Sequence, residues 1–190
     1  MEQLQAFDLV IFLALMAMFI VGYAQGLVRR LLGTAAILFS IVLALLLRPT
    51  LGDYLQQQWT GLAPLYSYMV AFAAVFLASA VTLSLAIQLT YRPAPLLTRY
   101  PVLDEILGGL VGVVEGLVIL IAVFLILDPY YTLPAVQDAI GPGEFTLLRT
   151  VHDLLDDTWT AGVLRDTVIP AVLSVFGFLF PADIIDTFGS

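Results

Sequence analysis

The chain has 190 residues, of which 61% are apolar, and its formal net charge is −8. A soluble domain is about 45–50% apolar even when glycine is counted, so the solvent for much of this chain must be lipid. The acidic balance argues against a nucleic-acid partner. No cysteine is present, which excludes disulfides, thiolate metal sites and thiol nucleophiles. The sequence predicts no cofactor and no metal site.

Four apolar runs are long enough, or nearly so, to cross a bilayer, because a spanning helix needs about 17–25 residues. They cover residues 9–24, 31–47, 65–89 and 106–127. The segment GLVRR between the first two runs is polar enough to turn, so we expect a tight helical hairpin there. The predicted fold is an all-α membrane protein, with four transmembrane helices as two hairpins over residues 1–128.

Residues 129–190 are predicted to form an extracytoplasmic C-terminal tail, which begins with a linker rich in proline and glycine. Apolar side chains then recur at steps of three and four residues: Phe145, Leu148, Val151, Leu155 and Trp159. This spacing predicts one amphipathic helix with an acidic outer face. The apolar run of residues 168–181 is too short to cross a membrane. We expect a short helix that lies at the membrane interface or packs against the bundle.

The arginines predict the orientation, because cytoplasmic loops carry an excess of basic residues. Arg29 and Arg30 follow the first run, and Arg92 and Arg99 follow the third. We therefore expect these two loops to face the cytoplasm and both termini to lie outside it. A second interpretation of Arg29 and Arg30 is a site for an anionic lipid or a partner.

A stripe of small residues marks the fourth run. Gly108, Gly112 and Gly116 recur every four residues and so share one helix face. Glycine on such a face allows the backbone of another helix to approach closely. Gly22 and Gly26, at the end of the first run, have the same spacing and are predicted to pack in the same way.

Glu115 lies within about 20° of the glycine stripe and close to mid-membrane. An ionised carboxylate facing lipid there costs about 2.5–3.5 kcal/mol, so we expect Glu115 to face the bundle. No arginine is expected to reach it across about 16 Å of helix. Glu115 should then be protonated and hydrogen-bonded to a backbone carbonyl or to a polar side chain such as Gln88. Both a structural role and a proton relay fit this position.

Hydrolytic chemistry has little support in the sequence. His152, Asp153 and Ser174 supply the residue types of a catalytic triad, but Ser174 lies inside an apolar run. The chain has no G-x-S-x-G motif. We interpret His152 as a solvated residue of the amphipathic helix and do not expect an enzyme.

Two segments resemble the colicin V production protein (CvpA) family: QGLVRR at the first turn and LDEILGGLVGVVEGL in the fourth run. The family's turn usually reads arginine-glycine-x-x-arginine, so Gly26 and Arg29 match, whereas Gln25 replaces the first arginine. Asp104 and the glycine stripe also match. Glu115 stands where the family often has arginine.

The resemblance implies a protein of the bacterial inner membrane that is linked to colicin V export and envelope homeostasis. The first hypothesis is a non-enzymatic scaffold or accessory factor for toxin or peptide export or envelope homeostasis. Its partner would be another membrane protein or a second copy of the chain, within the lipid bilayer. The alternative is a small transporter or channel subunit that uses Glu115.

Overall fold

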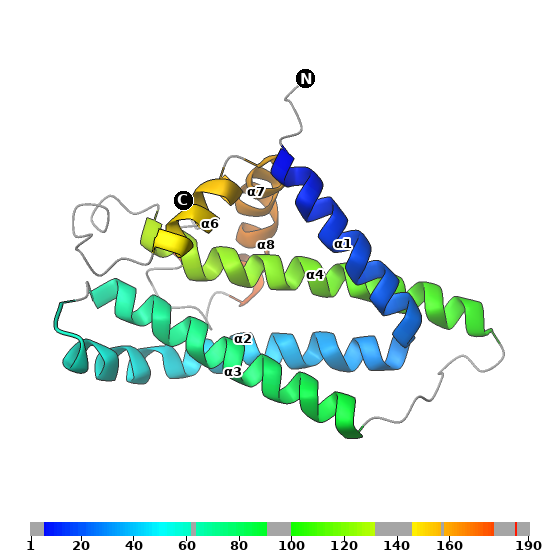
Figure 1. The fold of residues 1–190 in the computed structure, drawn as a ribbon, viewed down its shortest axis with the longest axis horizontal. Coiled ribbons are helices and arrows are strands. Elements are labelled where there is room, and N and C mark those ends of the chain that lie inside the picture. The colour runs from blue at the N-terminus through cyan, green and yellow to red at the C-terminus, as the bar shows by residue number, and fades with distance from the viewer. Residues whose placement is uncertain are drawn as a thin grey trace.

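The computed structural model describes residues 6–61, 64–90, 100–131, 146–156, 158–176 and 185. All regular structure in these residues is helical. Four long helices form the bundle: α1 (Ala6–Gln25), α2 (Leu27–Gln58), α3 (Pro64–Thr90) and α4 (Pro101–Tyr131). Each is long and apolar enough to span a membrane, which confirms the predicted all-α membrane fold (Figure 1).

Gly26 is the one residue between α1 and α2. Its φ of 75° lies in the left-handed region, which glycine adopts without strain. The prediction that GLVRR as a whole forms the turn is therefore wrong, because Leu27 to Arg30 form the first turn of α2. The turn is tight, but α1 then diverges from α2 and packs on α4 instead (Figure 1).

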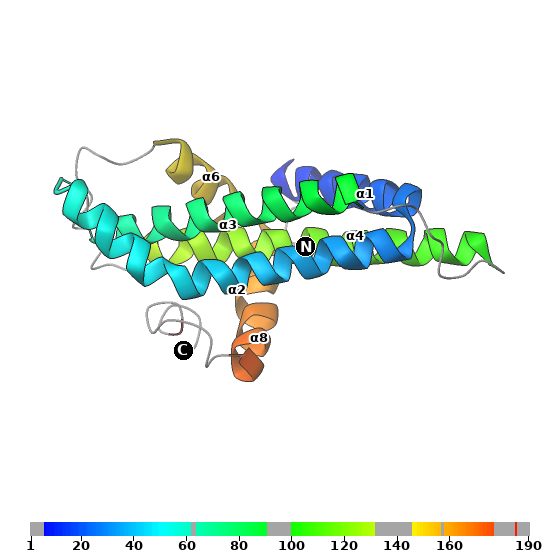
Figure 2. The same cartoon turned by 90° about the horizontal axis from the view of Figure 1, so that it is seen from below.

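α2 and α4 run in the same direction and form the middle of the bundle (Figures 1 and 2). α3 packs along α2, and α1 crosses α4 near the end that holds Gly26. We call this end, where α4 begins at Pro101, the turn end. The opposite end, where α2 and α4 finish, is the tail end. In an apolar stretch of 18 residues taken from each long helix, only 17% to 39% is buried inside the protein. Most of the apolar surface of these helices is therefore left for lipid.

The described part of the tail is a set of short helices beside the tail end of α4 (Figure 1). They are α6 (Thr146–Asp156), α7 (Trp159–Val163), the π-helical turn η1 (Leu164–Val168) and α8 (Ile169–Phe176). α7, η1 and α8 follow one another without a break, and α8 projects away from the bundle (Figure 2). Of the apolar run predicted to lie at the interface, the part that ends at Phe176 is helical, and the rest lies outside the described residues.

The segment predicted as one amphipathic helix is divided in two. Thr158 caps the start of α7, because its hydroxyl accepts from the Ala161 N–H at 3.0 Å and donates to the Leu155 carbonyl at 2.7 Å. A side chain that bonds to the backbone in this way starts a new helix. Phe145, the first residue of the predicted helix, lies outside the described residues.

Candidate functional site

α1 and α4 approach each other most closely where their glycines meet. A Cβ added at Gly108 would lie 2.6 Å from the carbonyl oxygen of Gly22 and 2.7 Å from the carbonyl carbon of Gly26. A Cβ at Gly22 would overlap the carbonyl oxygen of Gly108. Real Cβ atoms do not approach backbone atoms this closely, so the contact requires glycine on both helices. We call this contact the glycine crossing.

The stripe on α4 continues against α1 beyond the glycine crossing. A Cβ at Gly112 would overlap the carbonyl oxygen of Met18. A Cβ at Gly116 would lie 2.8 Å from a methyl carbon of Leu15, so this glycine opposes a side chain and not the backbone. Two of the three stripe glycines therefore lie against the backbone of α1, and the third lies against a flexible side chain.

Asp104 holds the start of α2 against α4. The Leu27 N–H donates to its Oδ2 at 3.2 Å, and the carboxylate is buried. A negative charge is stabilising at a helix N-terminus, where the first N–H groups have no partner within the helix. A Cβ at Gly26 would lie only 2.7 Å from the same oxygen. Gly26 thus permits both the turn and the approach of the carboxylate.

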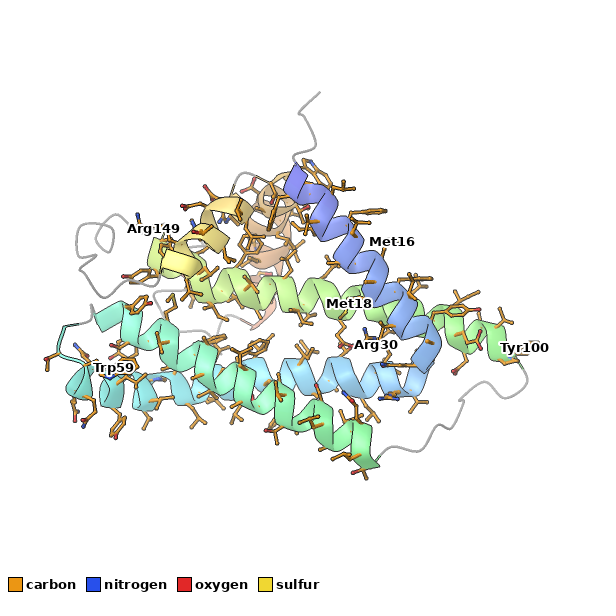
Figure 3. The ribbon with its side chains drawn as sticks, viewed as in Figure 1. Met16, Met18, Arg30, Trp59, Tyr100 and Arg149 are labelled. Carbon is orange, nitrogen blue, oxygen red and sulfur yellow. The ribbon has the colours of Figure 1, made fainter. Side chains whose placement is uncertain are left out.

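A buried ion pair lies next to the glycine crossing and joins three helices. Arg30 donates from Nη1 to the Glu115 Oε1 at 3.2 Å, and each side chain is 8% exposed. Arg30 Nη2 lies 3.4 Å from the Met18 carbonyl oxygen, and Thr34 donates to the Glu115 Oε2 at 3.5 Å. Arg30 therefore links α2 to both α1 and α4 (Figure 3).

The expectation that no arginine reaches Glu115 is wrong. Arg30 lies in the fourth position of α2 and not in a loop, so its side chain starts about 6 Å inside the turn. α4 begins beyond the turn between α1 and α2 (Figure 1). Glu115 therefore lies closer to the level of Arg30 than its distance from the start of α4 implies. A guanidinium is always charged, so Glu115 has a cation beside it, and the predicted site without a nearby cation is wrong.

The other predicted site residues lie apart from this ion pair. Gln88 is exposed near the end of α3, and Thr34 makes the hydrogen bond to Glu115 that was expected of Gln88. Arg29 is half-buried at the start of α2. Arg92 and Arg99 lie outside the described residues.

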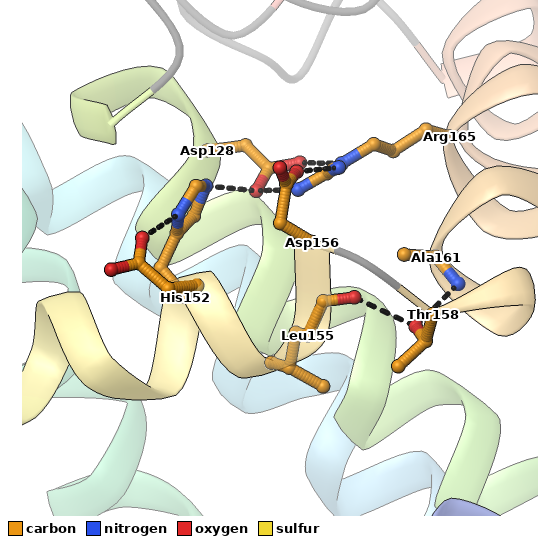
Figure 4. A network of polar contacts seen from close by, with 8 residues as sticks. Asp128, His152, Leu155, Asp156, Thr158, Ala161 and Arg165 are labelled. Atoms are coloured by element: carbon orange, nitrogen blue, oxygen red, sulfur yellow. Dashed lines mark hydrogen bonds and ion pairs between the residues drawn. The ribbon is translucent and has the colours of Figure 1, made fainter. Parts of the chain in front are cut away.

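A second polar cluster, which sequence reasoning missed, ties the tail to α4. Asp128, buried at the tail end of α4, accepts from Arg165 Nε at 2.6 Å and from Arg165 Nη2 at 2.8 Å. His152 Nε2 lies 3.5 Å from Asp128 Oδ1, and Asp156 also pairs with Arg165. We call these four residues the tail-end cluster (Figure 4). The sequence signal for this cluster was Asp128, an acidic residue directly after the apolar run of residues 106–127.

The tail-end cluster changes the proton affinity of His152. Burial lowers the pKa of the imidazole, but contacts with Asp128 and Asp153 and the charge of Asp156 outweigh burial. The net effect raises the pKa of His152 above its ordinary value of 6.5. His152 is thus a buried, charge-paired residue and not the solvated one that we predicted.

Asp8 makes a further contact between the tail and α1. Its carboxylate accepts from the Trp159 N–H at 3.2 Å, the Thr160 N–H at 3.1 Å and the Thr160 hydroxyl at 2.8 Å. It therefore satisfies the first N–H groups of α7, where a negative charge is favourable. α1 is held at one end by the glycine crossing and at the other by Asp8.

The described structure places the residues that could take part in metal binding or hydrolysis. They contain no group of three His, Cys, Asp or Glu side chains that could hold a metal ion. Ser174 donates to the Ala171 carbonyl at 2.8 Å on an exposed face of α8. The partners of His152 are two carboxylates, Asp128 and Asp153, on α4 and α6.

Four apolar helices, three of them linked by a buried ion pair, together with a helical tail define a multi-pass membrane protein. A family model described as Colicin V production protein matches residues 7–141. The chain therefore belongs to the colicin V production protein family, as the two sequence segments predicted. No match was found among curated proteins or among solved structures.

Proposed function

We propose that this protein is a non-enzymatic scaffold or accessory factor of the bacterial inner membrane. Its family ties it to colicin V production. In this proposal it supports an assembly that exports a toxin or peptide, or that maintains the envelope, and its partner is another membrane protein or a second copy of itself. Both termini lie outside the cytoplasm in this arrangement.

The observation that carries the proposal is the fixed position of Glu115. An acid that carries ions through a membrane must exchange its bound cation during each cycle. Glu115 instead contacts a permanent cation of its own chain, Arg30, and accepts from Thr34. Buried polar contacts of this kind hold membrane helices together.

The test is a variant that removes both charges but keeps polar side chains of similar length: Arg30→Gln/Glu115→Gln. In cells that lack the native protein, a scaffold should still restore peptide-toxin export and resistance to envelope stress with this double variant. Protein accumulation in the membrane is measured in parallel, so that loss of function is separated from loss of the protein. A double variant that accumulates normally and restores neither property would contradict the scaffold proposal.

The second candidate is a small transporter or channel subunit. Its support is that Glu115 is buried inside a spanning segment, since such acids often mark ion paths. Purified wild-type protein in proteoliposomes would then carry a proton or solute flux, and Arg30→Gln/Glu115→Gln would lack it. A wild-type flux no larger than that of protein-free liposomes favours the scaffold.

A further inference from the structure

Polar contacts at two places link the described part of the tail to the membrane helices. At one, the buried Asp128 of α4 binds His152 of α6 and Arg165 of η1. At the other, Asp8 of α1 binds the backbone N–H groups at the start of α7. These contacts hold α6, α7 and η1 against two spanning helices that the glycine crossing joins near their opposite ends.

The surface between the tail and the bundle is apolar. Leu155, Ala161 and Leu164 of the tail are at most 5% exposed and belong to one core cluster with Phe124 and Leu125 of α4. Release of the tail would therefore uncover apolar side chains on α4 together with the carboxylate of Asp128. Such a surface suits contact with another helix.

His152 is the single histidine of the chain, and histidine is the side chain whose charge ordinarily changes near neutral pH. From α4 it faces the Asp128 carboxylate and the Tyr131 ring, whose centre lies 5.0 Å from that of the imidazole. From its own helix it faces Asp153, with Asp156 one turn away. Two cations of the described residues also lie nearby. Arg165 of η1 shares Asp128 with His152, and the guanidinium carbon of Arg149 of α6 lies 6.0 Å from the centre of the Tyr131 ring.

We propose that the tail is a latch on the membrane domain, and that protonation of His152 holds it closed. Protonated His152 adds a second cation to Arg165 against the buried Asp128 and the nearby Asp156. Loss of that proton removes the cation that His152 supplies to these acids, while Arg165 stays in place. The contact between α6 and α4 then weakens, while the Asp8 contact still holds α7 against α1.

The direction of the pH effect follows from the environment of His152. Its pKa in the closed tail lies above the value of 6.5 that a solvated histidine has. The stabilisation is therefore complete below about pH 6.5 and is lost as the pH rises through the closed-state pKa. A pKa difference of one between the closed and open tail corresponds to about a tenfold change in the opening equilibrium. The latch is closed in mild acid and loosened in mild alkali.

The test uses the absence of cysteine from the chain. Leu155→Cys places a thiol under the latch, whereas Leu154→Cys places one on the exposed face of the same helix, where the native side chain is 47% exposed. Each variant, in lipid nanodiscs, is labelled with a maleimide from about pH 5.5 to about pH 9, a range that spans histidine titration. The ratio of the two labelling rates cancels the intrinsic pH dependence of the thiol.

We expect the rate at position 155, relative to position 154, to rise with pH and then level off. In a His152→Gln background the ratio should not change with pH, since glutamine does not titrate. A ratio that is constant in the presence of His152, or that rises equally with His152→Gln, would overturn the proposal. Val151→Cys, at a half-buried position of α6 that packs against the same core cluster, replaces Leu155→Cys if that variant does not fold.

Discussion

The ion pair between Arg30 and Glu115 is the contact of single residues that fixes α1, α2 and α4 against one another. Two charges buried in a low-dielectric interior lose their hydration, and only their mutual attraction and further hydrogen bonds compensate for that loss. Met18 and Thr34 supply part of this compensation from α1 and α2. The pair therefore favours one arrangement of three helices, since any other would separate the charges.

Glu115→Gln should destabilise the protein by about 3–5 kcal/mol, because it leaves the buried guanidinium of Arg30 without its counter-charge. Arg30→Gln should do the same to Glu115. The double variant should lose less than the sum of the two, which thermal unfolding in detergent would measure as a double-mutant cycle. Arg29→Gln, which removes a half-buried charge one position earlier, is the control. Additive losses would mean that the two side chains do not interact.

Gly112→Ala should lower the free energy of unfolding by about 1–3 kcal/mol, because the added methyl group overlaps the Met18 carbonyl and forces α1 away. Gly162→Ala is the matched control, since nothing lies within 4 Å of its added Cβ. That substitution should stabilise α7 slightly through the higher helix propensity of alanine. Equal effects of the two substitutions on the melting temperature would show that the stripe does not pack against a backbone.

At the scale of elements, the boundaries of the helices depend on individual caps. α2 begins where Asp104, from a different helix, accepts from the Leu27 N–H, and α7 begins where Thr158 bonds back to its own backbone. The apolar runs predicted the four spanning helices well, because length and hydropathy are local properties. The break at Thr158 was missed because the apolar spacing continues across it.

Thr158→Ala should cost about 1 kcal/mol through the loss of the α7 cap. The effect should be local, with faster hydrogen exchange at the amides of α7 and little change in the spanning helices. Thr82→Ala is the control, because Thr82 is an exposed threonine of α3 whose hydroxyl donates to the Ala78 carbonyl one turn earlier. Unchanged exchange in α7 would show that the Asp8 contact alone holds the start of that helix.

At the scale of the whole molecule, contacts between distant segments were the part that sequence could not predict. Arg30 resembled a loop residue because it follows a glycine and another arginine. Its meeting with Glu115 depends on how far α4 extends past the turn, which no local pattern records. The same holds for His152, whose contact with Asp128 depends on how the tail folds back. The sequence predicted that the glycine stripe and Glu115 face other helices. The packing of whole helices determined which residues they contact.

The orientation of the molecule in the membrane depends on which arginines lie free at the turn end, and the structure changes that set. Arg30 is buried and paired, so it no longer counts as a free charge at the turn end. Arg29 remains there, and the segment that holds Arg92 and Arg99 joins α3 to α4, whose start also lies at the turn end (Figure 1). Short loops rich in arginine stay in the cytoplasm, so the tail end, with the acidic tail, should face outward.

A reporter enzyme that is active only outside the cytoplasm should therefore be active when fused after Ser190. The same reporter inserted between Arg92 and Arg99 should be inactive, and a cytoplasmic fluorescent reporter should give the opposite pattern at both positions. Fluorescence from the C-terminal fusion would place the tail in the cytoplasm. Replacing Arg29, Arg92 and Arg99 with glutamine should mix the two orientations, because the charge bias that selects one of them is then removed. One unchanged orientation without these three arginines would show that they do not select it.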